Sequence, residues 1–238
     1  MRKRVVRRPY NQRSFCVIIT IILVFCFIIS GCTRATKNSI TPEVSGTPKE
    51  IQQVLTEGNL RFSEATPRAK DMGEGRRREL TKVQKPLAVI VSCSDSRVPP
   101  EHIFDQGLGD LFVVRVAGNV VSQEVLGSVE YAVEHLKTPL VIVLGHERCG
   151  AVTAAVEGGH HGGSIASITE RIRPLAEEQK AKGGKGTQLV ERTVDENVRA
   201  AVTELKKSPI LREALDIEKI KIEGAKYDLD TGKVEWLK

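Results

Sequence analysis

Three short apolar runs without polar alternation constrain the fold of this chain most strongly. They are LAVIVS (87–92), LFVVRVA (111–117) and PLVIVLG (139–145). A strand that is apolar at every position is buried on both faces, as in a parallel sheet covered by helices. Helical patterns separate the runs, for example VSQEVLGSVEYAVEHL (121–136), whose apolar residues recur on one helical face. This alternation predicts an α/β fold with a mainly parallel central β-sheet flanked by helices.

The segments around these runs supply the other predicted elements. A first helix is expected to begin at Thr47, which suits the N-cap, with Pro48 at the first helical position and Glu50 as the reciprocal capping partner. Residues 66–80 are charged and contain glycine, which indicates a connecting segment with a short helix. Later helices are expected over 150–159, 164–182, 189–208 and 209–216, followed by a strand and hairpin over 219–237.

The formal net charge of +6 originates in the first 14 residues. Six Lys and Arg residues lie there, and no acidic residue precedes Glu43. Taking these six from the 36 basic residues leaves 30, which equals the number of acidic residues in the chain. The remainder is therefore neutral, and its charge gives no indication of a nucleic-acid partner.

The same N-terminus has the features of an export signal. Its basic stretch is followed by the uncharged apolar residues 15–29 and then by Ser30-Gly31-Cys32. The apolar run is short for a bilayer span, which needs about 20 residues, and this disfavours the alternative of an uncleaved anchor helix. The ending I-S-G-C resembles a bacterial lipobox, so Cys32 is the predicted site of lipidation and the new N-terminus.

This interpretation divides the chain into three parts. Residues 1–32 form a lipoprotein signal peptide, and residues 33–47, rich in Thr, Ser, Pro and Gly, form a flexible tether. Residues 48–238 form the functional domain. We expect the protein to be exported and held by lipid at the cell membrane or the outer membrane.

Two of the predicted strands end in residue types that bind metals. Cys93, Asp95 and Arg97 follow the first run, and in an extended chain a spacing of two places them on one face. His146 and Cys149 follow the third run, where one helical turn can aim both at the same point. Ligands of parallel α/β sheets bind beyond the carboxyl ends of the strands, so both clusters are expected at one functional edge.

Two Cys and one His make a zinc set with an open fourth position. Asp95 either fills that position or pairs with Arg97, in which case the position opens to water. Three interpretations follow from these residues. They are a catalytic zinc, a closed structural zinc with Asp95 as permanent fourth ligand, and a Cys93–Cys149 disulfide, which an exported protein permits.

Several separate motifs occur in an order that resembles a known family. They are CSDSRV (93–98), DLFVVRVAGN (110–119), SVEYAV (128–133), GHERCGAV (145–152) and the closing GAKYDLDTGKV (224–234). In order and spacing they resemble the β-class carbonic anhydrases, and the resemblance extends over residues 50–237.

The resemblance implies a carbonate dehydratase, a zinc lyase that interconverts CO₂ with bicarbonate and a proton through attack by zinc-bound hydroxide. It implies a homodimer or tetramer in which the N-terminal helix embraces the neighbour. The site residues that it implies are the zinc ligands Cys93, His146 and Cys149, the dyad Asp95 and Arg97, and the substrate-orienting amide of Gln106. Relatives that hydrolyse carbonyl sulfide or carbon disulfide use the same zinc set, and a non-enzymatic zinc module is a further alternative.

Two positions depart from the family pattern. Many members have Asn where this chain has Val116, and we expect Val116 to carry no chemistry. Bacterial members that are controlled by a second bicarbonate have Trp where this chain has Ile90. The resemblance therefore implies that this regulatory site is absent.

Overall fold

The computed structural model describes residues 46–238. The predicted signal peptide, the lipidation site Cys32 and almost all of the predicted tether lie outside the described residues. Within residues 46–238, none of the helices combines the length and apolar character needed to span a bilayer.

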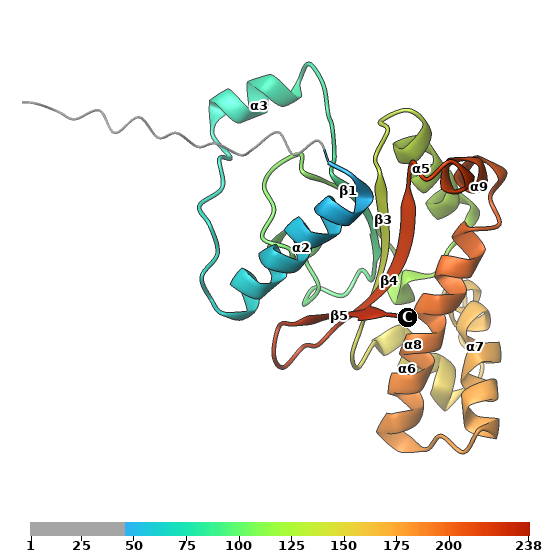
Figure 1. The fold of residues 1–238 in the computed structure, drawn as a ribbon. Coiled ribbons are helices and arrows are strands. Elements are labelled where there is room, and N and C mark those ends of the chain that lie inside the picture. Colours follow the sequence, from blue (N-terminus) through green and yellow to red (C-terminus); the bar gives the residue numbers. More distant parts are fainter. Residues whose placement is uncertain (1–45) are drawn as a thin grey trace, which may run out of the picture. The chain divides into compact units, whose positions relative to one another are not determined.

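A five-stranded sheet forms the centre of the described domain, in the order β2-β1-β3-β4-β5 (Figure 1). The first four strands are parallel, and β5 pairs antiparallel with β4. The strands are β1 (Ala88–Ser92), β2 (Leu111–Arg115), β3 (Leu140–His146), β4 (Lys221–Tyr227) and β5 (Val234–Leu237). The predicted mainly parallel α/β fold is confirmed.

Strand β1 lies between β2 and β3, and every residue of β1 and β3 is buried. Alternate side chains of these strands enter two different cores. Val89 and Val91 belong to one core cluster, whereas Ala88 and Ile90 belong to the other. This explains the unbroken apolar runs, because a strand covered by helices on both faces has no solvent-facing position for polar side chains.

Helices cover both faces of the sheet (Figure 1). The core cluster that contains Val89 also contains residues of α5 (Gln123–Glu134), α8 (Gly186–Leu205) and α9 (Pro209–Asp216). The opposite cluster contains residues of α2 (Pro48–Ser63) and of the short helix α4 (Pro100–Ile103). Truncating one of these fully buried Leu or Ile side chains to Ala is expected to cost about 2–5 kcal/mol of stability.

The start of α2 has the capping box that the sequence predicts. The Thr47 hydroxyl accepts a hydrogen bond from the Glu50 amide, and the Glu50 carboxylate accepts one from the Thr47 amide at 2.7 Å. Pro48 occupies the first helical turn. Such a cap contributes about 1 kcal/mol to stability.

Three further helices are α3 (Glu74–Leu80), which precedes β1 in the sequence, and α6 (Gly150–Glu157) and α7 (Ile165–Ala181), which follow β3. Helix α3 is the short helix expected in the connecting segment. Helices α6 and α7 pack against each other and against α8. Two short elements were not predicted, namely α4 and the 3₁₀ turn η1 (Ala117–Asn119), which directly follows β2.

Candidate metal centre

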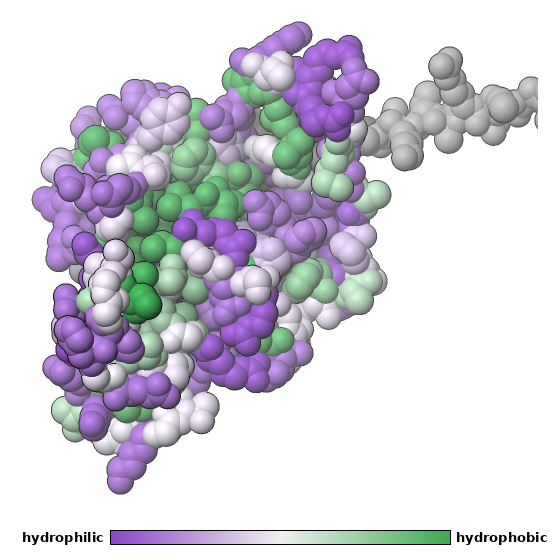
Figure 2. Space-filling view, turned by 180° about the vertical axis from the view of Figure 1, so that it is seen from behind, coloured by the Kyte–Doolittle hydropathy of each residue, from purple (hydrophilic) through white to green (hydrophobic). Residues whose placement is uncertain are grey.

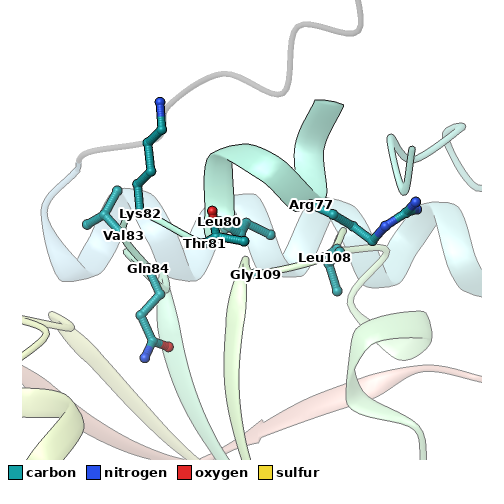
Figure 3. Close-up of a pocket in the computed structure, with 8 residues that line it drawn as sticks. All are labelled: Arg77, Leu80, Thr81, Lys82, Val83, Gln84, Leu108 and Gly109. Atoms are coloured by element: carbon teal, nitrogen blue, oxygen red, sulfur yellow. The ribbon is translucent and has the colours of Figure 1, made fainter. Parts of the chain in front are cut away.

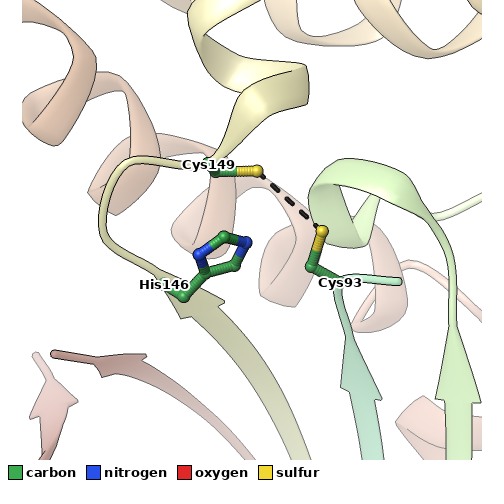
Figure 4. A group of neighbouring side chains, drawn as sticks. All are labelled: Cys93, His146 and Cys149. Carbon is green, nitrogen blue, oxygen red and sulfur yellow. Dashed lines mark hydrogen bonds between the residues drawn. The ribbon is translucent and has the colours of Figure 1, made fainter. Parts of the chain in front are cut away.

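Two neighbouring strands bring the predicted ligands together. β1 and β3 are adjacent and parallel, and Ser92 pairs in register with Leu144, so Cys93 and His146 leave the same edge of the sheet. The ligand atoms of Cys93, His146 and Cys149 all lie within 4.8 Å of one another (Figure 4). Both cysteines are free, with their Sγ atoms 4.0 Å apart, so the disulfide alternative is wrong.

His146 is oriented as a metal ligand. Its side chain is fully buried, and its Nδ1 lies 2.8 Å from the Glu147 carbonyl oxygen, which only accepts. Nδ1 therefore carries the proton, and the lone pair of Nε2 faces the two cysteines. Within the described residues, Nε2 has no hydrogen-bond partner. A buried imidazole nitrogen without a partner is costly, and a cation bound by Nε2 would satisfy it.

Cys149 is placed by a tight turn between β3 and α6. Arg148, at φ 51°, reverses the chain after the strand, and Cys149 is the N-cap of α6. Gly145 leaves room for α8, because a Cβ there would lie 2.5 Å from Cγ2 of Val198. The strand end, the turn and the helix start thus place the imidazole and the thiol together at the end of the sheet.

Cys93 lies just after β1 in an apolar surround. It belongs to a buried cluster that also contains Val120, which follows η1, and Cys149, which precedes α6. The same cluster contains Ile172 of α7 and Val194 of α8. Its Sγ accepts hydrogen bonds from the amides of Gly118 at 3.3 Å and Asp95 at 3.4 Å. Amide donors of this kind stabilise a thiolate where water is excluded.

The two thiols are coupled through their hydrogen bond. That bond lowers the pKa of Cys93 to about 4, with help from the backbone amides of Gly118 and Asp95, against the opposing effect of burial. The hydrogen bond to Cys93 and burial raise the pKa of Cys149. The two sulfurs are close enough to share a hydrogen bond, and a divalent cation bound in place of that proton would have the two thiolate ligands that zinc prefers.

Asp95 and Arg97 form a close ion pair beside this group. Arg97 donates from Nε to Oδ1 of Asp95 at 3.0 Å and from its terminal nitrogen to Oδ2 at 2.7 Å, and its backbone amide donates to Oδ1 at 2.9 Å. The hydrogen bond from the Arg97 side chain lowers the pKa of Asp95 to about 2. Oδ2 of Asp95 lies 3.9 Å from Nε2 of His146, so the carboxylate borders the centre while bound to Arg97.

The local backbone differs from the extended chain considered for residues 93–97. The Val98 amide donates to the Asp95 carbonyl at 3.0 Å, which closes a turn directly after β1. The extended arrangement is therefore wrong. Asp95 and Arg97 meet because the Asp95 carboxylate accepts from the amide two residues on, a local bond that Asp side chains favour in turns.

Gln106 lies elsewhere in the described chain. Its Nε2 donates to the Phe104 carbonyl at 2.7 Å, and it lies beside Gly58 of α2. Among residues 46–238, no hydrogen bond joins Gln106 to the Cys–His–Cys group. Its assignment as a substrate-orienting amide stays a prediction.

Sequence reasoning missed Arg115, the last residue of β2. Its guanidinium donates to the Cys93 carbonyl at 3.0 Å and to the Asp95 carbonyl at 2.6 Å, which ties the loop after β1 to the neighbouring strand. Arg115 could have been found only from its position at the end of a strand that neighbours β1. The apolar sequence of a single strand does not show which strand lies next to it.

A hollow lies between α3, the segment that follows it and the loop before β2 (Figure 3). It has a volume of about 620 Å³ and is lined by Arg77, Leu80, Thr81, Lys82, Val83, Gln84, Leu108 and Gly109. Leu108 and Gly109 precede β2, so this hollow lies at the amino end of the strands. Ligands of parallel sheets bind at the opposite end, which favours the Cys–His–Cys group as the functional site.

Comparisons with known proteins identify relatives over most of the described domain. A family model described as "Carbonic anhydrase" matches residues 88–234. The carbonic anhydrase of Mycolicibacterium smegmatis is 41% identical over 194 residues, which cover 79% of this chain and 92% of the relative. Carbonic anhydrase 2 of Mycobacterium tuberculosis is 40% identical over 191 residues, which cover 78% of this chain and 91% of that protein.

Solved structures agree with these sequence matches. A structure described as one of two tetrameric β-carbonic anhydrases from Sordaria macrospora has a TM-score of 0.65 and 27% identity, covering 79% of this chain and 97% of that one. A Coccomyxa β-carbonic anhydrase in complex with acetazolamide has a TM-score of 0.62 and 30% identity, covering 67% of this chain and 75% of that one. The chain belongs to the β-class carbonic anhydrases, a family of lyase enzymes, as its motifs predicted.

Proposed function

We propose that this chain catalyses the reversible hydration of CO₂ to bicarbonate and a proton, with zinc held by Cys93, His146 and Cys149. The observation that carries the proposal is the buried Cys–His–Cys group, whose ligand atoms lie within 4.8 Å of one another, with the Asp95–Arg97 pair beside it. The relatives named carbonic anhydrase support the same reaction.

The donor set fits zinc rather than a harder cation. Two sulfurs and one imidazole nitrogen suit a borderline-soft ion, and three protein ligands leave a fourth position for reacting water. Zinc bound there supplies the Lewis acidity that makes water a nucleophile near neutral pH. The apolar side chains that surround both cysteines exclude bulk water and strengthen electrostatic interactions in the site.

Asp95 and Arg97 act on the fourth position from the protein side. The Arg97 guanidinium holds both carboxylate oxygens of Asp95, so the carboxylate remains ionised and is kept at the border of the centre. From there it accepts a hydrogen bond from the reacting water and orients the lone pair of that water toward CO₂. A carboxylate released from Arg97 would instead be free to become the fourth ligand and close the site.

Stopped-flow CO₂ hydration by the purified chain beginning at Gly46 tests the proposal. This part contains the complete sheet and both cores. The expected result is one tightly bound zinc per chain and CO₂ hydration that stops when the zinc is removed. Zinc without CO₂ hydration would overturn the proposal, and activity on carbonyl sulfide or carbon disulfide would then identify the alternative reaction.

We also propose that the chain forms a homodimer or tetramer. Strand β2 is a sheet edge whose apolar residues are only partly buried, and an apolar area lies on the face seen in Figure 2. The Sordaria macrospora relative, described as tetrameric, supports the same arrangement. Light scattering of the purified chain is expected to give at least twice the mass of one chain, which is 26.2 kDa for the full sequence and correspondingly less for the chain beginning at Gly46.

Export and lipid attachment through Cys32 complete the proposal. Their support is the basic stretch, the apolar run over 15–29 and the ending Ser30-Gly31-Cys32. Mass spectrometry of the protein from cell membranes is expected to find a lipid-modified N-terminus at Cys32. The variant Cys32→Ser should lose the lipid, and an unmodified, uncleaved N-terminus in the wild type would contradict the proposal.

A further inference from the structure

The Cys93 sulfur receives a hydrogen bond from a glycine in an unusual conformation. Gly118, within η1, has φ +69°, a left-handed value that favours glycine, and its amide donates to Cys93 Sγ at 3.3 Å. A Cβ at this position would lie 2.9 Å from Cδ1 of Ile172 and 3.1 Å from Cβ of Ala151. Glycine therefore supplies both the conformation and the close approach that bring a backbone N–H to the sulfur.

The peptide that follows Gly118 is held at both ends. The Gly118 carbonyl accepts a hydrogen bond from Nδ2 of Asn197 at 2.7 Å. The Asn119 N–H, at the other end of the same peptide unit, donates to the Val116 carbonyl at 2.9 Å. The Val116 amide in turn donates to the Ser92 carbonyl, directly before Cys93. These bonds fix the orientation of Gly118, and with it the direction of the N–H that points at the sulfur.

Asn197 is an unusual residue for its place in α8. The residue is only 5% exposed, and the neighbouring Val194 and Val198 belong to apolar core clusters. A buried amide costs free energy unless its donors and acceptors are satisfied, and an apolar residue of similar size would fill this place at no such cost. The hydrogen bond to Gly118, 79 residues away, gives this polar side chain a specific task.

We propose that Asn197 is a positioning residue for the metal ligand Cys93. By fixing the Gly118 peptide, it keeps the Gly118 N–H directed at Sγ of Cys93, which both orients the sulfur and draws electron density from it. This inference rests on the proposed zinc site. Outer partners of metal ligands commonly change metal affinity or activity by about 10–100-fold when removed.

The variant Asn197→Leu tests the inference because it removes the donor and keeps the branching and the number of heavy atoms of the side chain. Zinc release into excess chelator is expected to be about 10–100-fold faster than in the wild type. In the Co²⁺-loaded protein, the thiolate-to-metal charge-transfer absorption is expected to shift, because one of the two sulfurs has lost its amide donor. A loss of fold stability alone would speed zinc release but would not shift the Co²⁺ charge-transfer absorption, so that shift is the decisive readout.

Thr193→Val is the matched control on the same helix. It also removes one buried hydrogen bond of 2.7 Å, from the Thr193 hydroxyl to the Leu189 carbonyl, and has no link to Gly118. The rate of zinc release from Thr193→Val is expected to stay within about twofold of the wild-type rate, because Thr193 makes no hydrogen bond to a zinc ligand or to Gly118. Equal zinc release and an equal Co²⁺ spectrum in Asn197→Leu and Thr193→Val would overturn the inference.

A second variant covers the case in which Asn197→Leu does not fold. Asn197→Ser shortens the side chain and does not overpack the site, and its hydroxyl is too short to reach the Gly118 carbonyl, so the same faster release is expected. Release from Asn197→Ser at the wild-type rate would overturn the inference. Failure of the proposed function has a different signature, because the wild type itself would then bind no zinc or would retain zinc after Cys93→Ser.

Discussion

The two halves of the metal centre are built in different ways. His146 and Cys149 come from a strand end and a helix start, and both are almost completely buried. Cys93, Asp95 and Arg97 come from the loop after β1 and the turn that it leads into, where Asp95 is 17% exposed and Arg97 is 53% exposed at the side chain. Regular structure fixes the first half, whereas side-chain hydrogen bonds from Arg97 and Arg115 hold the second. The first half therefore supplies two of the three candidate ligands, whereas the second combines the third ligand, Cys93, with the Asp95–Arg97 pair, which is suited to adjust the surroundings of the metal.

Removing a ligand from the half between β3 and α6 should have the largest effect. Cys149→Ser deletes a thiolate that no nearby sulfur can replace, so zinc is expected to be lost and CO₂ hydration to fall about a thousandfold or more, as for the loss of several kcal/mol of metal assistance. Metal analysis and stopped-flow assays measure both quantities. Retention of zinc with full activity would show that this half does not hold the metal.

Asp95→Asn tests the half that follows β1, which is formed by Cys93, Asp95 and Arg97. The neutral amide keeps the size of the side chain but loses the ion pair with Arg97, and activity is expected to fall about 10–100-fold while zinc stays bound. Asp230→Asn is the control, since it breaks an ion pair of 2.9 Å with Arg148 at the surface. Such exposed pairs contribute about 0–1 kcal/mol. Full activity of Asp95→Asn would remove the distinction between the halves.

Arg115→Met should lower activity less than Asp95→Asn, because Arg115 only supports the loop after β1. It removes the donors to the Cys93 and Asp95 carbonyls, and a resulting loss of about 1 kcal/mol in positioning corresponds to roughly fivefold lower kcat/KM. Arg199→Met is matched to it, because Arg199 also donates to a backbone carbonyl, that of Lys238. If both variants had the same kcat/KM as the wild type, the loop after β1 would need no support from β2.

The smallest effect concerns acid stability. Since the pKa of Asp95 is lowered to about 2 in the folded chain and is about 3.9 when unfolded, the ion pair stabilises the fold above pH 3.9. That contribution is lost as the pH falls through 2. The difference in unfolding free energy between wild type and Asp95→Asn, measured by urea denaturation, is therefore expected to shrink between about pH 5 and pH 2. A constant difference over this range would place Asp95 outside the ion pair.

The sequence predicted the sheet, its flanking helices and the Cys–His–Cys ligand set, because each depends on local patterns. The apolar runs identify β1 and β3, and their carboxyl ends carry Cys93 and His146. The turn at Asp95, by contrast, depends on one backbone bond that no periodicity signals. Arg115 and Asn197 reach partners 20 to 79 residues away, at backbone atoms that every residue possesses. Such contacts become visible only when the strand order is known.

The separation of the two thiols along the chain has a consequence for how the protein matures. Cys93 and Cys149 are 56 residues apart and meet only after β1 and β3 have paired, so no short segment of the nascent chain contains the complete binding site. Parallel pairing of this kind joins residues far apart in the chain and is intrinsically slow to form. Zinc bound at the proposed site would thus select the finished fold, and each tenfold rise in free zinc above the dissociation constant would add about 1.4 kcal/mol to its stability.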